Sequence, residues 1–404
     1  MKFSNNAMSA ILLCSYIGIQ DSSTMKPLSL GEWNHFLDKL IEKEQEPSIV
    51  LEHDLTTLKQ MQLPDEFVER VHQLVSRGAG IALELDDLSK KGISIVTQFD
   101  SDYPVLMRRR LKKKTPPVLF YAGDIRLAKK IGIAVVGSRN VDDDGVEFTK
   151  KLVEKAAEEK LIIYSGGAKG VDMISERTAI NAGSAVVCFL ADSLLSKIKK
   201  KETIDSIICG KLLLISDVKP DAGFSSARAM NRNKYIYTSA YGAFVVASDY
   251  NKGGTWSGAV EAMRNGWSKT LVWNHKEYAG NQKLIEKGGI AYELSADKIY
   301  DVITRKEETF SQLELFDENQ LEAEDKQDIR SGKKSEVDGE TSDLYNYVKN
   351  YITIHLTGGM NIDEASKYFN VAKEQMTLWL KRLCEEQLVE NEKERFFPKP
   401  VDTA

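Results

Sequence analysis

The chain has 404 residues, which is too long for one ordinary hydrophobic core and predicts two or three domains. Hydrophobic residues make up 42% and charged residues 28%, values that are typical of a globular protein and exclude collagen-like, disulfide-rich and membrane-embedded chains. The formal net charge of -5 excludes a protein that coats nucleic acid through bulk positive charge. Any nucleic-acid site must therefore be a local patch.

Four cysteines are spread along the chain without a C-x-x-C pair or a histidine at metal-ligand spacing. We therefore expect buried thiols in a reducing, cytoplasmic compartment, with no metal and no cofactor. The apolar stretch from Ala10 to Ile19 lacks the flanks of a signal peptide, so we expect a core helix there. No other stretch approaches the roughly 20 apolar residues that span a bilayer, and no membrane contact is expected.

Helical periodicity dominates the first 91 residues. Trp33, Phe36 and Leu40 recur at helical spacing, and Pro64 followed by acidic residues indicates the first turn of a further helix. This pattern predicts a helical domain over residues 1–91, of the SAM or helix-hairpin-helix kind.

After Gly92 the pattern changes to short β-branched runs that alternate with amphipathic stretches. This alternation predicts an α/β fold, with an extended Rossmann-like, largely parallel sheet over residues 92–303. The expected strands are 93–96, 118–120, 133–136, 161–163, 185–190, 212–215, 244–247 and 270–273.

The remaining residues divide into a polar, acidic linker over 304–341 and an ordered segment over 342–404. Three expected helices, 343–355, 362–369 and 373–386, precede two short strands, which is the outline of a winged helix-turn-helix. Five glutamates follow the third helix and disfavour tight binding of duplex DNA, so we expect a protein-contact or weak DNA role. The surface of that helix carries Lys373, Gln375, Thr377, Lys381 and Arg382, and its core face carries Met376, Trp379, Leu380 and Leu383.

Two glycine-rich loops follow consecutive expected strands and precede helices. Such loops present free backbone N–H groups to an anion, and Arg139 and Lys169 add positive charge beside them. Neither loop has the G-x-G-x-x-G or Walker pattern, and tight turns between strand and helix are the alternative. Because both loops lie at one rim of the sheet, we favour a phosphate site. Its loop residues are Gly137, Ser138, Ser165, Gly166, Gly167 and Gly170.

A third stretch, 227–237, concentrates basic residues with amides and tyrosines. Arginines contact phosphates, and arginine and tyrosine faces stack on unpaired bases, so this stretch favours a nucleic-acid strand over a single nucleotide. A solvated basic helix face is the alternative. The candidate contacts in this stretch are Arg228, Arg232, Asn233 and Lys234.

Taken together, these segments resemble the DNA-processing protein A (DprA, or Smf) family over roughly residues 93–295. The family's G-S-R is present at 137–139, and its S-G-x-A-x-G-[IV]-D is present at 165–172. Further correspondences are the approach segments 99–104 and 116–120, the R-N-R-I-I element at 232–236, and the closing residues Asn281, Leu284, Ile285 and Gly288.

This resemblance implies a protein, not an enzyme, that binds single-stranded DNA, protects or processes incoming DNA, helps to load a RecA-type recombinase and acts as a homodimer. By position it implies DNA contacts at Arg139, Lys169, Arg232 and Lys234. The family's Phe-Pro before R-N is replaced by Ala229-Met230, so an aromatic stacking group is absent or supplied by Tyr235 or Tyr237. The family's Ala-His is replaced by Ser175-Glu176, so the chain resembles a diverged branch in which DNA binding is more secure than recombinase loading.

A second resemblance leads to an enzyme. Residues 251–261 are similar to the P-G-G-x-G-T-x-x-E loop of nucleotide phosphoribohydrolases of the LOG kind. That likeness implies a nucleotide sensor or an N-glycosidase with Glu261 as its acidic group, in defence against foreign DNA. A glycine turn at a helix start is the simpler alternative.

Two short motifs remain. The charge run Arg108–Lys114 is expected to be a solvated loop, with nucleic-acid contact as the alternative. In the linker, Gln312–Phe316 resembles the Q-L-[SD]-L-F peptide that docks in a sliding clamp, although chance occurrence is the stronger expectation for so short a motif.

Overall fold

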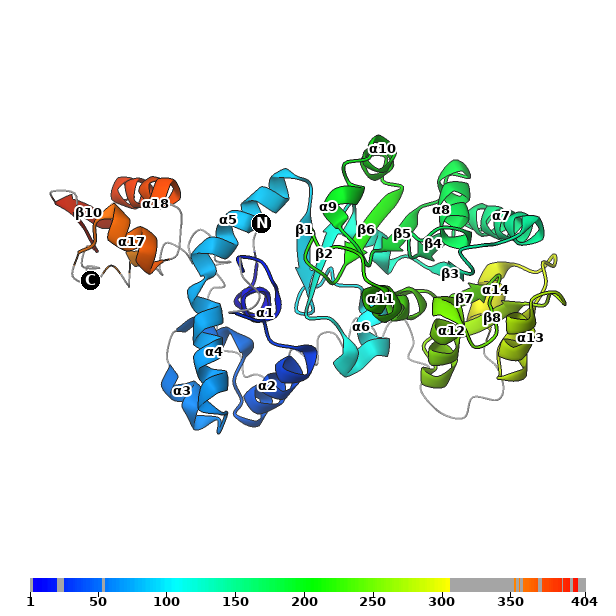
Figure 1. Cartoon of the computed structure of the whole chain (residues 1–404), viewed down its shortest axis with the longest axis horizontal. Coiled ribbons are helices and arrows are strands. Elements are labelled where there is room, and N and C mark those ends of the chain that lie inside the picture. The colour runs from blue at the N-terminus through cyan, green and yellow to red at the C-terminus, as the bar shows by residue number, and fades with distance from the viewer. Residues whose placement is uncertain are drawn as a thin grey trace.

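The computed structural model describes residues 3–19, 25–52 and 55–305, and then 352–353, 356, 359–369, 373–386, 388–392 and 395–398. Of the expected linker 304–341, residues 304 and 305 are described and belong to the end of α14 (Ile299–Thr304), and the rest, with the peptide Gln312–Phe316, lies outside the described residues. Among the described residues, no helix is long and apolar enough to cross a membrane. Figure 1 shows a bundle of helices beside a broad sheet that carries helices on both faces.

The N-terminal region is helical, as its periodicity predicted. It contains α1 (Asn5–Cys14), α2 (Leu30–Glu42), the 3-10 turn η1 (Pro47–Glu52), α3 (Leu55–Gln60), α4 (Asp65–Ser76) and α5 (Gly78–Lys90). Ser29 and Glu32 form a capping box at the start of α2, which satisfies N–H groups that a helix leaves free. Residues 7–13 of α1 are all buried, so the apolar stretch near the N-terminus is a core helix.

A nine-stranded sheet follows in the described part of the chain, in the order β1-β2-β6-β5-β4-β3-β7-β8-β9. The pairs β1–β2 and β2–β6 are antiparallel, and all other pairs are parallel, so the prediction of a largely parallel sheet is confirmed. The sequence missed only β9, which has three residues. The strands are β1 (Ser94–Thr97), β2 (Val118–Ala122), β3 (Gly132–Val136), β4 (Ile162–Ser165), β5 (Val186–Phe189), β6 (Leu212–Ser216), β7 (Gly242–Val245), β8 (Lys269–Trp273) and β9 (Ile290–Tyr292).

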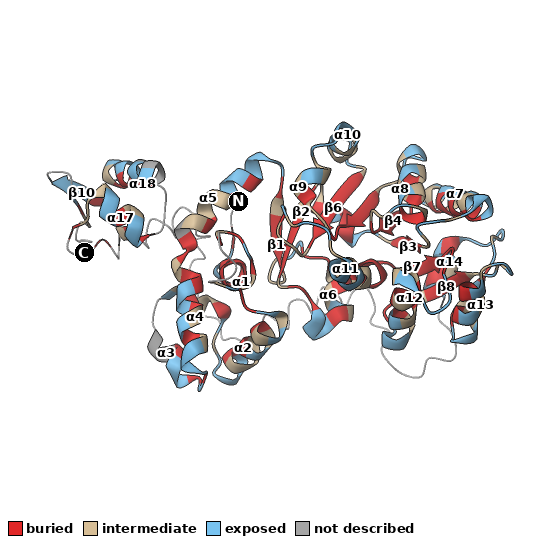
Figure 2. Ribbon diagram, in the orientation of Figure 1, coloured by how far each residue is buried: buried red, intermediate tan, exposed pale blue. Residues whose placement is uncertain are grey.

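Helices cover both faces of this sheet because alternate residues of each strand point to opposite sides. In β3, Ile133 and Val135 belong to the core beneath α7 (Asp143–Glu158) and α8 (Val171–Asn181). Ala134 and Val136 belong to the core beneath α11 (Ser226–Ser239) and α12 (Gly253–Asn265). Figure 2 shows the strands as the most continuously buried part of the molecule. The shorter elements are α6 (Val105–Leu111), η2 (Lys112–Lys114), η3 (Ile125–Lys129), α9 (Leu194–Lys197), α10 (Lys201–Ile208), α13 (Ala279–Glu286) and α14 (Ile299–Thr304).

Arg109, Lys112, Lys113 and Lys114 of the charge run Arg108–Lys114 are exposed, as expected, but the run is helical and not a loop. It forms the end of α6 and the turn η2, and Arg110 points inward. Its guanidinium donates hydrogen bonds to the carbonyl oxygens of Tyr237, Thr238 and Ala240 at the end of α11. We expected Arg110 to be solvated because a local run of charge does not show that the end of a distant helix packs against it.

The C-terminal part contains α17 (Ile362–Tyr368), α18 (Lys373–Glu385) and the antiparallel pair β10 (Val389–Glu392) and β11 (Arg395–Pro398). Met376, Leu380 and Leu383 are buried in α18, which agrees with the predicted core face. Most of the expected helix 343–355 lies outside the described residues, so the winged helix stays a prediction. This small core also receives Ala82 and Leu83 from α5.

Candidate nucleic-acid interface

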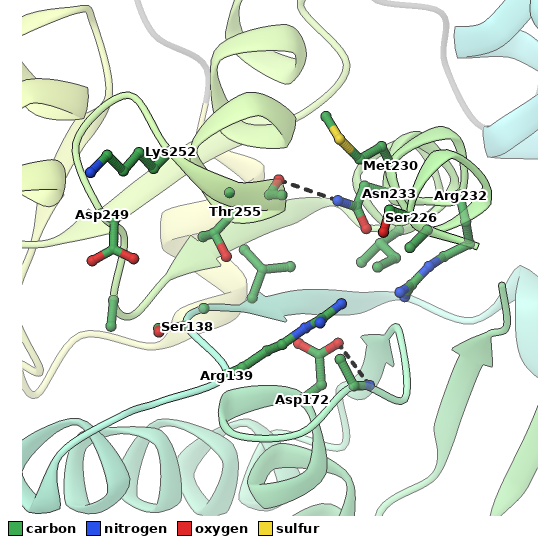
Figure 3. Close-up of a pocket in the computed structure, with 18 of the residues that line it drawn as sticks. Ser138, Arg139, Asp172, Ser226, Met230, Arg232, Asn233, Asp249, Lys252 and Thr255 are labelled. Atoms are coloured by element: carbon green, nitrogen blue, oxygen red, sulfur yellow. Dashed lines mark hydrogen bonds between the residues drawn. The ribbon is translucent and has the colours of Figure 1, made fainter. Parts of the chain in front are cut away.

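A cavity of about 440 Å³ opens at the carboxyl ends of the parallel strands. It lies where the strand order reverses: the chain proceeds from β3 to β4 on one side, and β7 pairs with β3 on the other side. Open α/β sheets bind ligands at this reversal, because the loops after the two neighbouring strands separate there. The wall is formed by the loops after β3, β4 and β7 and by residues of α11 and α12 (Figure 3).

The loop after β3 contributes Gly137, Ser138 and Arg139 to this wall. A Cβ on Gly137 would lie 2.5 Å from Cγ2 of Val171, so only glycine allows the two loops to approach. The Ser138 N–H donates to the carbonyl of Ala247 at 2.8 Å, which ties the loop to the end of the neighbouring strand. Arg139 is exposed and extends into the cavity.

The loop after β4 packs directly beneath the first loop. Gly170 has a φ of 77°, and a Cβ there would lie 2.3 Å from the carbonyl oxygen of Ser138. Gly167 also has a positive φ, of 68°, which disfavours any other residue. Ser165 is buried at the end of the strand, whereas Lys169 is exposed and does not line the cavity. The glycines therefore make tight turns, and those turns bring two loops to one rim.

Arg232 on α11 is the buried cation of the cavity. Its side chain is only 6% exposed, and its Nε and Nη1 atoms have no hydrogen-bond partner among the described residues. A Cβ on Gly166 would lie 1.3 Å from Arg232 Nη1, so the guanidinium occupies the space that the glycine leaves. Arg139 and Arg232 thus approach the same space from opposite walls (Figure 3).

Asp172 lies below these two arginines, in the first turn of α8. It is buried and accepts a hydrogen bond from the Ala168 N–H at 3.3 Å. Burial raises the pKa of Asp172 above its ordinary value, while Arg232 and Arg139 act in the opposite direction. The pKa is raised overall because the cost of desolvating the carboxylate exceeds the attraction to the arginines.

Asn233 joins α11 to the start of α12. Its side-chain amide donates to the carbonyl of Gly254 at 3.2 Å, and both residues line the cavity. The first turn of α12, from Gly253 to Thr255, presents its backbone to the same space. A helix start attracts anions because its first N–H groups have no partner within the helix.

Eight of the predicted residues do not line this cavity, and four of them, Ser165, Gly166, Gly167 and Gly170, belong to the loop beneath it. Lys169 is exposed outside its wall, and Arg228 and Lys234 line a different cavity on the other side of α11. Glu261, the acidic group of the enzyme hypothesis, is exposed and lies about 12 Å along the α12 axis from Gly253. Gly137, Ser138, Arg139, Arg232 and Asn233 do come together there, with the remaining loop glycines beneath them.

The sequence also missed an aromatic group at this site. Tyr235 and Tyr237, which we considered as replacements for the absent Phe-Pro aromatic, are 2% and 1% exposed and cannot stack on an unpaired base. Phe224 is 58% exposed, and the Arg139 guanidinium lies 6.0 Å from its ring centre. The sequence signal that could have identified Phe224 is its position just before the basic stretch that forms α11. Asp249 and Lys252 were also missed: Asp249 lies just before the motif at 251–261, and Lys252 lies within it but was not singled out.

Comparisons with known proteins place the chain among similar proteins. The chain is 28% identical to the DNA processing protein DprA of Streptococcus pneumoniae over 139 residues, which are 34% of this chain and 49% of that protein. It is 26% identical to the DNA processing protein DprA of Bacillus subtilis over 225 residues, which are 54% of this chain and 73% of that protein. The chain thus spans about half the length of several curated relatives that it matches.

A solved structure shows the same fold. The X-ray structure of DNA processing protein A from Streptococcus pneumoniae aligns with a TM-score of 0.52 and 20% identity, over 72% of this chain and 95% of that one. A family model described as DNA recombination-mediator protein A matches residues 94–304, which is more than half of the 404 residues. The chain belongs to the DNA recombination-mediator protein A family.

Proposed function

We propose that this chain is a recombination mediator that binds single-stranded DNA, with the phosphates of the strand held in the cavity between Arg139 and Arg232. The observation that carries the proposal is the state of Arg232. A guanidinium that is 6% exposed, with two nitrogen atoms unpaired among the described residues, lines a cavity that is open to an anion. A phosphate in the cavity offsets the cost of burying the Arg232 charge.

The surroundings favour a strand over a single nucleotide. Phe224 and Met230, which are 58% and 51% exposed, lie beside the cavity and offer apolar surface to unpaired bases. Proteins that bind single strands combine a positive groove with such stacking surfaces. Glu261, the acidic group of the enzyme hypothesis, lies outside the cavity wall, and the acidic residues that do line the cavity are Asp172 and Asp249.

The test is the substitution Arg232→Met, which keeps most of the side-chain volume and removes the charge. We expect the affinity for a single-stranded oligonucleotide to fall by about tenfold or more, and the slope of log affinity against log salt to become shallower by about 1. Fluorescence anisotropy over a salt series measures both quantities. Arg264→Met on the exposed side of α12 is the matched control. Unchanged affinity and slope in Arg232→Met would refute the site.

Recombinase loading and homodimer formation belong to the same proposal, and family membership supports them. The chain would help to load a RecA-type recombinase on single-stranded DNA. The measurement is the DNA-dependent ATPase of the recombinase, with and without this chain. Sedimentation of the purified chain tests the homodimer, and titration of a peptide that carries Gln312–Phe316 tests the sliding clamp.

A further inference from the structure

A second and larger cavity, of about 830 Å³, lies between the N-terminal helical region and the antiparallel side of the sheet. It shares one wall with the first cavity, since α11 contributes residues to both. The remaining walls come from the segment after α1, the segment before α2, the start of β2 and the loop after β6. Their lining residues include Tyr16, Leu28, Pro117, Asp217 and Lys219.

The predicted DNA contacts on α11 are divided between the two cavities. Arg232 and Asn233 line the first cavity, whereas Arg228, Asn231 and Lys234 line the second. Met230, 51% exposed, lies on the surface of the helix next to both sets. A strand held by its phosphates in the first cavity can therefore continue across the first half of α11 and enter the second.

Positive charge is in excess around the second cavity. Its lining carries four cations, Lys26, Lys219, Arg228 and Lys234, against the two acids Asp217 and Asp221. Lys219 is 3.3 Å from Glu84 and 3.8 Å from Asp221, so its charge is largely balanced within the protein. Arg228 and Lys234 both lie on α11, next to the first cavity, which suits successive phosphates of one strand.

The interior of the second cavity suits an unpaired base. Tyr16 is 45% exposed on one wall, and Leu28, Val118 and Phe120 supply apolar surface. Opposite them, Asp217 accepts a hydrogen bond from the Tyr235 hydroxyl at 2.6 Å, and the amide of Asn231 lies 3.5 Å from the same carboxyl oxygen. Amide and carboxyl groups pair with the edges of bases, and apolar and aromatic walls hold their faces.

We infer that this second cavity is a subsite for one unpaired base of the same DNA strand, with the phosphates on either side of that base held by Arg228 and Lys234. The inference rests on the proposed function and extends it: one chain holds the strand at two points, on either side of α11. A free nucleotide offers the same chemistry, so the experiment must separate a base within a strand from a mononucleotide.

The test compares Tyr16→Ala with the wild-type chain on two oligonucleotides, of about four and about twelve nucleotides, a span that covers typical single-strand sites. We expect Tyr16→Ala to weaken binding of the longer oligonucleotide by about tenfold, because one stacking contact is lost, and to leave the shorter one unchanged. Tyr300→Ala on α14 is the control, because Tyr300 is 43% exposed and lines neither cavity.

The outcomes distinguish a failure of the second subsite from a failure of the proposed function. If Arg232→Met loses both oligonucleotides while Tyr16→Ala binds the longer one like the wild type, the second subsite is refuted and the proposed function stands. If the wild-type chain binds neither oligonucleotide, both fail. If dCMP binds the wild type and not Tyr16→Ala, with equal affinity of both for the longer oligonucleotide, the cavity takes a free nucleotide and the strand subsite is refuted.

Discussion

Arg232 and Asp172 form a buried pair of opposite charge at the base of the cavity, and their surroundings decide how each behaves. Burial raises the pKa of Asp172 despite the two arginines, which shows that the interior is costly for its carboxylate. Arg232 is also buried, and its Nε and Nη1 atoms have no hydrogen-bond partner among the described residues. The exposed Arg139 instead rests beside Phe224, where a base and a phosphate are within reach of one pair of side chains.

The raised pKa of Asp172 predicts that DNA binding depends on pH. Protonation removes a negative charge beneath the phosphate site, so the affinity should increase as the pH falls from 7 toward about 4, where unperturbed aspartates titrate. Asp172→Asn mimics the protonated form, and its Oδ1 still accepts a hydrogen bond from Ala168. We expect it to bind more tightly at neutral pH and to lose most of this dependence, as measured by anisotropy titrations at several pH values.

The raised pKa of Asp172 also makes the stability of the fold depend on pH. A group whose folded-state pKa lies above its unfolded value contributes stability that is complete below the unfolded pKa and is lost as the pH rises through the folded pKa. Asp172→Asn should therefore unfold at a higher denaturant concentration than the wild type at neutral pH, with a difference that shrinks in acid. Asp144→Asn on the exposed first turn of α7 is the control. A wild-type affinity for DNA that does not change with pH would contradict the predicted role of Asp172 in binding.

Helix α11 contributes residues to both cavities. It begins with Ser225 as its N-cap and ends where Arg110 donates to three of its carbonyl groups, so both ends are satisfied. Its faces supply different cations to the two cavities, while Tyr235, Ile236 and Tyr237 anchor it in the core. Any change that loosens this helix should disturb both cavities at once.

Arg110→Ala tests this role. The substitution leaves the carbonyl groups at the end of α11 without their donor, and we expect the free energy of unfolding to fall by about 2 kcal/mol. Chemical denaturation followed by circular dichroism measures this loss. Its exposed neighbour Arg109 provides the control, because Arg109→Ala removes an equal charge from the surface. Equal stability of the two variants would show that Arg110 is a surface cation after all.

The whole molecule joins its helical region to its sheet through one apolar core. Residues of α1, α2 and α4 belong to the same buried cluster as those of β3 and α7. Trp33 is fully buried, and its ring lies 6.2 Å from that of Phe99, just beyond β1, in an edge-to-face arrangement. The second cavity lies along this junction, so the relative position of the two parts determines its shape.

Trp33→Ala tests how strongly the two parts are coupled. Loss of this side chain leaves a cavity in the shared core, and we expect a cost of about 3–5 kcal/mol. Because the core is continuous, residues 3–305 should unfold in one transition that shifts as a whole in differential scanning calorimetry. His35→Ala on the exposed side of α2 should leave it in place. A variant in which the helical region melts separately would contradict this coupling.

Residue patterns alone determined the class of the fold and the order of its elements. Alternating β-branched runs predicted eight of the nine strands, since the period of apolar residues reflects the geometry of each element, and β9 was too short to show a period. The motifs also located the two glycine loops, because positive φ angles and close backbone approach require glycine at positions such as Gly166 and Gly170.

Only the tertiary structure decided which of the basic residues share a site. Arg228 and Arg232 are four residues apart and so lie on nearly the same face of α11, yet Arg232 lines the first cavity, while Arg228 lines the second together with Lys234. Burial likewise removed Tyr235 and Tyr237 as stacking groups and left Phe224 exposed beside Arg139. These outcomes depend on packing between segments distant in sequence, which no local pattern of residues encodes.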